Sequence, residues 1–354
     1  MKEYKWKLKD AKFTKDKGKV FSCFSCGGGS TMGYKLAGFD VIGCNEIDPK
    51  MMDIYKENHT PKYSFLEGIQ TFKDKEELPK ELYELDILDG SPPCSSFSLV
   101  GNREKDWGKE KKFREGQSEQ VLDTLFFDFI DLAERLQPKV VIAENVKGIL
   151  MGDAKKYCAE IYKAFDKAGY YLDKWLLNSS KMGVPQKRER VFFIAIRKDL
   201  SNKLPSGMDL FNNMPELNLM FNKKLITFKE IDEGEKGKRK IITGKYVLSL
   251  IKNKTSSGVW QTHKKSIGGK LGGVGFGNSV VLEKTPLTVI SGGCVAYYDD
   301  KNYISNNEMC MIGTFPIDYN FGKNKVQYII GMSVPPIMIK NIALEIYNQW
   351  LSKL

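Results

Sequence analysis

The stretch Lys19-Val20-Phe21-Ser22-Cys23-Phe24-Ser25-Cys26-Gly27-Gly28-Gly29-Ser30-Thr31-Met32-Gly33 decides the fold class of this 354-residue chain. Its first six residues are mostly apolar and predict a buried strand, and the three consecutive glycines predict a tight turn. Met32, Leu36 and Ala37 then follow the apolar spacing of a helix. A strand, a glycine loop and a helix in this order can cradle a nucleotide-like ligand.

Further apolar runs along the chain predict strands that alternate with helices. Phe39 to Cys44 predicts a strand that delivers Glu46 about 20 residues after the glycines, where a carboxylate can accept hydrogen bonds from both ribose hydroxyls. The remaining predicted strands are 84–88, 139–143, 170–177 and 191–196, and the predicted helices are 49–58, 120–136 and 154–168. This order predicts an α/β fold with a doubly wound, mostly parallel sheet, to which the last two strands add a hairpin and a terminal antiparallel strand.

A cysteine follows the strand that ends near Asp89. Pro92 and Pro93 lack N–H donors and cannot continue a sheet ladder, so Cys94 comes just past a strand end. A cysteine at such a place is either a small buried hydrophobic residue or a nucleophile. The chain has only His59 and His263, and neither lies near these motifs, which argues against a Cys-His hydrolase.

The predicted topology brings several chemically useful side chains to one edge of the sheet. The carboxyl ends of parallel strands share an edge, and ligands bind there in doubly wound folds. An antiparallel last strand would bring its amino end to the same edge. We therefore expect this edge to collect Gly28, Glu46, Cys94, Glu144, Arg188 and Arg190.

Composition narrows the possible location and partners. No stretch approaches the roughly 20 apolar residues of a membrane span, and the first residues lack the apolar core of a signal peptide. We expect a cytoplasmic protein without membrane association, whose seven scattered cysteines are reduced thiols. The Cys23-x-x-Cys26 pair has no second pair to complete a metal site, so none is expected. A net charge of +11 and a pI near 9.0 favour a polyanionic partner such as a nucleic acid.

The chain changes character after residue 198. From 199 to about 277, Asn, Lys, Pro and Gly are frequent and helical periodicity is poor, which predicts a second domain. Residues 326–331 predict a strand-like segment, Pro335-Pro336 a turn, and 337–351 a closing helix. We therefore predict a catalytic, ligand-binding domain over 1–198, completed by 325–354, and a smaller domain with a hinge over 199–324.

Six motifs in order resemble those of DNA (cytosine-5) methyltransferases. They are Phe24-Ser25-x-x-Gly28-Gly29-x-x-x-Gly33, Pro92-Pro93-Cys94-x-x-Phe97-Ser98, Glu144-Asn145-Val146, Gln186-x-Arg188-x-Arg190, Glu308 to Pro316, and Gly331 to Pro336. The resemblance covers nearly the whole chain except the leader and residues 199 to about 282. Methylases of exocyclic amines resemble Asp-Pro-Pro-Tyr at the second motif, whereas Cys94 here indicates a carbon target.

The resemblance implies an S-adenosylmethionine-dependent fold with a smaller target-recognition domain over 199–324. By resemblance, Cys94 would attack C6 of a cytosine flipped out of duplex DNA, Glu144 would hold the base, and Arg188 and Arg190 would contact the base or orient the site. C5 would then receive the methyl group. The residues implied to bind S-adenosyl-L-methionine are Phe24, Ser25, Gly27, Gly28, Gly29, Gly33, Glu46, Ile47, Ile69, Pro93, Ser333 and Val334.

Several residues depart from the family's pattern. Cys26, Ser91 and Ser95 replace two common glycines and a glutamine. Gly68 stands where an aspartate is expected to reach the adenine amino group, and Met332 stands where asparagine is usual. The residues that would replace these contacts are not evident from the sequence.

Other functions compete with DNA methylation. A tRNA cytosine-5 methyltransferase would keep the chemistry but change the substrate, a non-catalytic DNA-binding protein would keep the charge, and an NAD-dependent dehydrogenase would use the glycine loop and Glu46. Our leading expectation is a monomer that methylates a specific duplex sequence, with a cognate restriction endonuclease as a further expected partner. Asn278, Lys270, Arg239 and His263 are candidates for reading bases, and the recognition sequence does not follow from the chain.

Overall fold

The computed structural model describes residues 2–93, 110–111, 120–121, 124–152, 154–204, 215–234, 239–243, 277–280, 282–292, 294–297 and 302–354. Cys94, the polar segment that follows it, Lys270 and His263 lie outside these residues, and so do the side chains of 277–280. The chain divides into two compact units. The larger unit comprises Phe13–Leu177, Glu189–Met220 and Lys340–Leu354, and the smaller comprises Met1–Lys12, Asn178–Arg188 and Phe221–Ile339.

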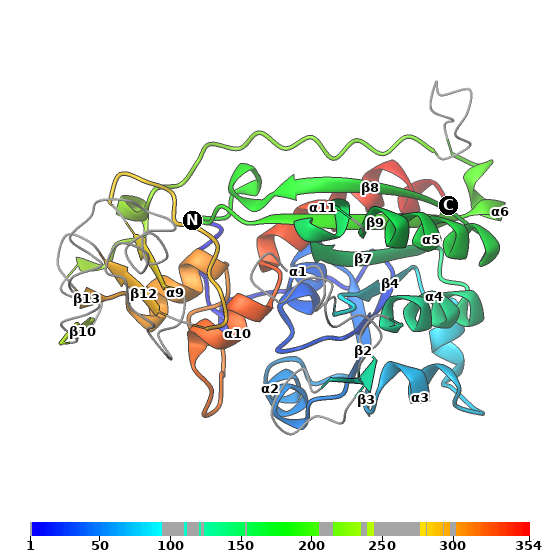
Figure 1. Ribbon diagram of the computed structural model, residues 1–354, viewed down its shortest axis with the longest axis horizontal. Helices are drawn as coiled ribbons and strands as arrows, with labels where there is room; N and C mark the ends of the chain where they lie inside the picture. Colours follow the sequence, from blue (N-terminus) through cyan, green and yellow to red (C-terminus); the bar gives the residue numbers. More distant parts are fainter. Residues whose placement is uncertain are drawn as a thin grey trace. The chain divides into compact units, whose positions relative to one another are not determined.

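The larger unit is built on a seven-stranded sheet with the order β3-β2-β1-β4-β7-β9-β8 (Figure 1). All described pairings from β3 through β7 are parallel, and β9 pairs with β7 in the antiparallel direction. The doubly wound, mostly parallel sheet with a late antiparallel strand is therefore confirmed. Its strands are β1 (Lys19–Cys23), β2 (Asp40–Glu46), β3 (Tyr63–Leu66), β4 (Ile87–Gly90), β7 (Val140–Val146), β8 (Tyr170–Asn178) and β9 (Glu189–Arg197).

Apolar packing on both faces holds this sheet. Side chains at alternate strand positions, such as Phe21 and Cys23, join one buried cluster with α3 (Ile69–Lys73), α4 (Leu125–Leu136) and α5 (Ala154–Lys167). Away from this cluster, Tyr34 of α1 (Gly29–Ala37) contacts Phe39, and Phe39 contacts Tyr347 of α11 (Pro336–Gln349). Helix α2 (Pro49–His59) packs on β2 through Met52 and Tyr55, which contact Cys44.

Local details differ from the sequence prediction in two places. The helix expected from Gln120 begins only at Leu125, because Gln120–Val121 forms a short strand, β6, that pairs with Glu110–Lys111, β5. The stretch before Glu81, in which we predicted no element, contains β3 and α3 and then the 3-10 turn Lys80–Glu84, η2. Outside the second sheet and its helices, the remaining described elements are one short helix and five 3-10 turns. They are α6 (Lys198–Ser201), η1 (Leu8–Asp10), η3 (Lys147–Leu150), η4 (Ser179–Met182), η5 (Phe228–Glu230) and η7 (Leu351–Lys353).

The smaller unit contains a four-stranded sheet with the order β10-β13-β12-β11. These strands are β10 (Lys240–Ile241), β11 (Gly277–Val280), β12 (Cys294–Tyr297) and β13 (Asn302–Tyr303), and they are accompanied by α9 (Asn306–Gly313) and α10 (Val326–Met332). The strand predicted over 326–331 is wrong, since this segment is helix α10. Its β-branched residues favour a strand locally, but Ile329 and Ile330 are buried, and Ile330 packs so closely on Gly313 of α9 that a Cβ there would overlap it.

The unit boundaries differ from the predicted domain limits in several places, since 1–12, 178–188 and 325–339 belong to the smaller unit and 199–220 to the larger. The leader belongs to the smaller unit, where Trp6 Nε1 donates to the Thr314 carbonyl at 3.1 Å. Residues 215–220 belong to the larger unit, where Trp350 Nε1 donates to the Glu216 carbonyl at 3.0 Å. The assignment of one unit to catalysis and the other to target recognition stays a prediction.

One described segment, Val326–Lys353, is long and apolar enough to cross a membrane by length and composition, with a mean hydropathy of 1.4. In the apolar 18-residue window of this segment, 67% is buried within the protein. That degree of burial is typical of core helices of a folded domain.

Candidate active site

The glycine loop between β1 and α1 has an unusual backbone. Phe24 and Cys26 adopt left-handed φ angles of 51° and 49°, and Gly28 has a φ of 85°. Left-handed geometry costs a non-glycine residue about 1–2 kcal/mol, and such residues cluster at ligand sites. Phe24 also contacts Phe129 of α4, with ring centroids 6.3 Å apart. The loop thus has a specific shape, and Gly28 adopts its positive φ without the steric cost of a side chain.

Glu46 lies at the end of β2 and holds this loop. Its carboxylate accepts hydrogen bonds from the backbone N–H of Cys26 at 2.7 Å and of Asp48 at 2.9 Å. In doubly wound folds an acidic side chain at this position accepts hydrogen bonds from the ribose hydroxyls of the ligand. Glu46 is buried, so its bonds to the loop backbone are shielded from water.

Other loop residues also fit a nucleoside ligand. The Ser25 hydroxyl is buried, and among the described residues it interacts only weakly, with the Cys44 thiol, so it can bind a ligand without losing a strong hydrogen bond. A Cβ on Gly68 would lie 3.6 Å from Ile47 Cδ1, which places Ile47 beside the start of α3 and its buried Ile69. Together these groups could hold an adenosine-type cofactor, with polar contacts from the loop and an apolar wall from Ile47 and Ile69.

The segment that leads to Cys94 is fixed against the end of β7. Asn145 Nδ2 donates to the Pro92 carbonyl at 3.2 Å, and Asn145 Oδ1 accepts from the Val146 N–H at 2.8 Å. Asn145 is buried, so this link is shielded from water. Cys94 itself lies outside the described residues, but Pro92, two residues before it, is hydrogen-bonded to β7, the strand that carries Glu144.

Glu144 and Arg190 form an ion pair at this strand end. Arg190 Nε lies 2.9 Å from Glu144 Oε1, and the two side chains are 15% and 12% exposed. The antiparallel register sets this pair, since Glu144 lies opposite Phe192 and Val146 lies opposite Arg190. Burial lowers the pKa of Arg190, and Glu144 opposes this effect by favouring the charged guanidinium.

Asp89 is a buried carboxylate in the same region, one residue before β4 ends. Its oxygens accept hydrogen bonds from Ser22 Oγ at 2.9 Å and Tyr34 OH at 3.0 Å. Burial raises the pKa of Asp89 to about 6, although hydrogen bonds from Ser22, Tyr34 and Ser30 work against this rise. We assigned no role to Asp89 or Asn145 from the sequence. A charged residue inside the otherwise apolar run 87–90 was the available signal for Asp89.

Three predicted site residues belong to the smaller unit. Arg188 is buried, and its guanidinium donates to the carbonyls of Val289 at 3.0 Å and Gly331 at 3.1 Å. Ser333 and Val334 are buried at the end of α10, where Ser333 Oγ donates to the Ile329 carbonyl at 2.8 Å. The contacts of Arg188 favour a role in holding the backbone of its own unit, and the catalytic and cofactor roles of all three residues stay predictions.

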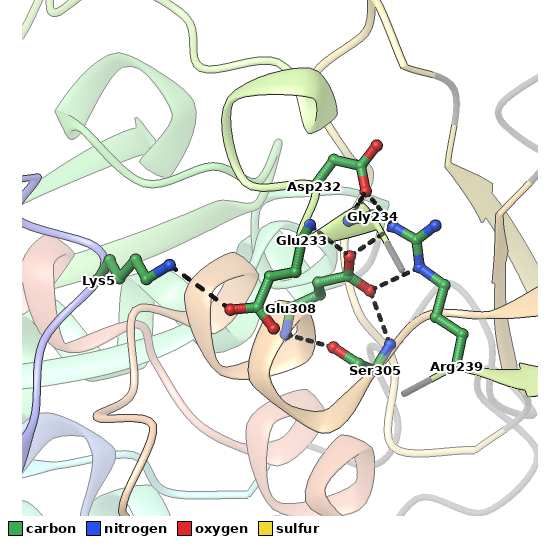
Figure 2. Close-up of polar contacts among 7 residues, drawn as sticks. All are labelled: Lys5, Asp232, Glu233, Gly234, Arg239, Ser305 and Glu308. Carbon is green, nitrogen blue, oxygen red and sulfur yellow. Dashed lines mark hydrogen bonds and ion pairs between the residues drawn. The ribbon is translucent and has the colours of Figure 1, made fainter. Parts of the chain in front are cut away.

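Arg239, a candidate for base reading, lies in a buried polar network in the smaller unit. Figure 2 shows its guanidinium directed at Glu308 and Asp232. Arg239 Nε donates to Glu308 Oε2 at 3.1 Å, and the Arg239 side chain is 6% exposed. A guanidinium that is buried and paired in this way is not available to base edges, so the structure argues against base reading by Arg239.

A family comparison agrees with this geometry. The family model described as C-5 cytosine-specific DNA methylase matches residues 18–348. The chain belongs to this family. The match covers most of the chain and does not favour the dehydrogenase, tRNA-methylase or non-catalytic alternatives.

Several curated relatives of this methylase chain are Type II methyltransferases, and others are orphan methyltransferases of Bacillus phages. M.FnuDI of Fusobacterium nucleatum is 36% identical over 184 residues, which cover 52% of this chain and 48% of the relative. M.NgoPII of Neisseria gonorrhoeae is 33% identical and covers 60% and 55%, respectively. M1.HphI of Haemophilus parahaemolyticus is 25% identical and covers 90% and 84%. The alignments thus span about half the length of the first two relatives and most of the third.

Solved structures confirm the methylase fold. A prophage-encoded E. coli protein superposes with a TM-score of 0.63 at 21% identity, covering 94% of this chain and 99% of that chain. A mutant DNMT2 of Spodoptera frugiperda gives a TM-score of 0.60 at 16% identity and covers 91% and 97%. At these identities the likeness concerns the fold alone.

Proposed function

We propose that this chain transfers a methyl group from S-adenosyl-L-methionine to C5 of a cytosine within a specific duplex DNA sequence. One observation carries the proposal: Asn145 fixes the segment leading to Cys94 beside the Glu144–Arg190 pair, in a chain of the cytosine-C5 methylase family. The glycine loop follows β1, and Glu46 ends β2. In the sheet these strands are two and three positions from β7, and because the strands are parallel their carboxyl ends lie at the same edge as Glu144.

Cys94 would act as the nucleophile. Its thiolate forms a bond to C6 of the base, and the electron pair of the C5–C6 double bond moves toward N3 and the exocyclic amino group. Glu144 would hold N3 and that amino group and supply a proton to the ring, which makes the ring a better electron sink. Arg190 would keep the Glu144 carboxyl oriented toward the base through their 2.9 Å contact.

The second half of the reaction releases the enzyme. After methyl transfer, a base removes the C5 proton, the C5–C6 double bond reforms, and the bond from C6 to the Cys94 sulfur breaks. Splitting substitution at an unreactive ring carbon into addition and elimination lowers the highest barrier. The cofactor, when bound, supplies an electrophilic methyl group on a sulfonium.

The cofactor would lie against the glycine loop. Ser25 Oγ and the Glu46 carboxylate offer polar contacts, and Phe24, Ile47 and Ile69 offer apolar ones. Gly27, Gly28, Gly29 and Gly33 would allow a close approach of the backbone, and Pro93 would lie on the side of the nucleophile. Roles for Arg188, Ser333 and Val334 remain part of this proposal.

A net charge of +11 supports duplex DNA as the substrate, because neutralising phosphates releases counterions. Extruding the target base costs a few kcal/mol, which contacts in the pocket offset. A monomeric state, a cytoplasmic location and a cognate restriction endonuclease are further parts of the proposal, and the Type II names of the relatives support the last of them.

Expression in a host without cytosine methylation, followed by bisulfite sequencing of the host DNA, tests the function. We expect protection of one cytosine within a short recurring sequence, and loss of that protection in Cys94→Ala. An unmethylated genome in cells that contain the folded wild-type protein contradicts the proposal.

A further inference from the structure

Near the carboxyl ends of the paired strands β1 and β4 lies a buried carboxylate, Asp89, and the described groups that interact with it are neutral or negative. In the sheet, β2 and β3 lie on one side of β1, and β4 lies on its other side. This is the switch point at which ligands bind in doubly wound sheets. Asp89 pairs in register with Ser22, and each lies one residue before the end of its strand.

Asp89 is enclosed by the elements that form the glycine loop. Its partners are the hydroxyls of Ser22 on β1 and Tyr34 on α1, at 2.9 and 3.0 Å, and Ser30 in the first turn of α1 is a third donor. Only 2% of Asp89 is exposed. Carboxylates are rarely buried so deeply without a paired cation, yet in the described part of the chain Asp89 makes no salt bridge.

We propose that Asp89 is the counter-charge for the sulfonium of S-adenosylmethionine. It would make the protein bind this cation more tightly than S-adenosylhomocysteine, in which the sulfur is an uncharged thioether. This inference rests on the proposed function, which places the cofactor at the glycine loop. Both Asp89 oxygens already accept hydrogen bonds, so Asp89 acts through its field in a poorly solvated interior and is not a catalytic residue.

The proposal predicts a pH dependence with a definite sign. Because burial raises the pKa of Asp89 to about 6, its charge develops as pH rises through 6, and the preference for the sulfonium should grow in the same range. The other titratable groups that face Asp89 are Tyr34, Cys23 and Glu144. Burial raises the pKa values of Tyr34 and Cys23 well above their ordinary values, so both stay neutral, and Glu144 is paired with Arg190.

Isothermal titration calorimetry of the full chain with each of the two cofactor forms tests this inference. Between about pH 5 and pH 7, below the range in which an α-amino group titrates, we expect the affinity ratio of S-adenosylmethionine to S-adenosylhomocysteine to rise by roughly tenfold. Asp89→Asn preserves the shape of the side chain and should give a flat ratio. Asp86→Asn is the matched control. Asp86 lies just before β4 begins and pairs with Lys139 at 2.8 Å, so this variant should keep the wild-type pH dependence of the affinity ratio.

Proton release gives a second readout that needs no variant. Binding of the sulfonium should expel a fraction of a proton from wild-type protein near pH 6, seen as a dependence of the heat on the ionisation enthalpy of the buffer, and the thioether should expel less. A constant affinity ratio across this pH range, or the same pH-dependent ratio in Asp89→Asn, overturns the counter-charge. If neither compound binds, the cofactor assignment is wrong, and this inference fails with it.

Discussion

Each unit contains a glutamate–arginine pair, buried in the smaller unit and slightly exposed in the larger, and the two pairs differ in the other groups that contact them. Glu308 is fully buried and accepts hydrogen bonds from Arg239, from the Ser305 N–H at 2.8 Å and from the Glu233 N–H at 3.0 Å. Glu144 is 12% exposed, and in the described residues its contact with Arg190 is the one that fixes it. The carboxylate of Glu308 therefore uses its hydrogen-bonding capacity within its own unit, whereas the carboxylate of Glu144 can still bind a base.

This difference separates a structural pair from a chemical one. Glu308 closes a capping box with Ser305 at the start of α9 and joins Glu233 and Arg239 to that helix, as Figure 2 shows. Glu144 ends a strand beside the segment that leads to Cys94. Substitutions should therefore affect folding at the first pair and catalysis at the second.

The largest effect should follow from Glu144→Gln. Glutamine keeps a hydrogen bond to Arg190 but cannot supply a proton to the ring, so the methylation rate should fall by about 10²–10⁴-fold. Stability should fall by only about 1–2 kcal/mol. Single-turnover methyl transfer measures the rate, and urea unfolding measures the stability. A rate within about a factor of three of wild type would contradict a catalytic role for Glu144.

Glu308→Ala should act in the opposite way. It leaves the buried Arg239 without its main partner, which costs about 3–5 kcal/mol. Hydrogen exchange should accelerate in peptides from 302–315, while cofactor binding by the larger unit should persist. The double variant Glu308→Ala, Arg239→Ala should lose less stability than the sum of the single variants. Unchanged exchange in that segment would refute the structural role.

Gly90→Ala tests whether the strand end that precedes Cys94 requires close packing. A Cβ at this position would lie 2.6 Å from Phe129 Cε2, and Phe129 in turn contacts Phe24 of the glycine loop. Overpacking of this kind costs about 1–3 kcal/mol and should also weaken cofactor binding. Gly292→Ala is the control, because no atom of the described residues lies within 4 Å of its Cβ position. Equal melting temperatures for the two variants would contradict the prediction.

The smallest effect should come from an exposed pair. Arg197 Nε lies 2.7 Å from Asp199 Oδ1, but Asp199 is 62% exposed, so water and salt screen the interaction. Asp199→Asn should change stability by no more than about 0.5 kcal/mol and leave the methylation rate unaltered. If urea unfolding showed a loss of more than about 1 kcal/mol in the free energy of unfolding, exposure would not predict how much these ion pairs contribute to stability.

Much of the larger unit was predictable because its strands are apolar runs that alternate with helices. The edge that carries Gly28, Glu46, Glu144 and Arg190 followed from strand order alone. Helix α10 did not follow, because its Val-Gln-Tyr-Ile-Ile run favours a strand and only packing on α9 makes it helical. The partners of Arg188 and Arg239 also could not be predicted, since they lie 101 and 69 residues away along the chain.

Trapping of the covalent intermediate tests the central claim most directly. In a duplex that carries 5-fluorocytosine at the methylated position, C5 has no proton to lose, so elimination is blocked and the bond from C6 to Cys94 should persist. We predict a protein–DNA adduct that survives denaturation, forms only with S-adenosylmethionine present, and is absent in Cys94→Ala. Methylation of ordinary DNA without such an adduct, or an adduct formed by Cys94→Ala, would contradict the account.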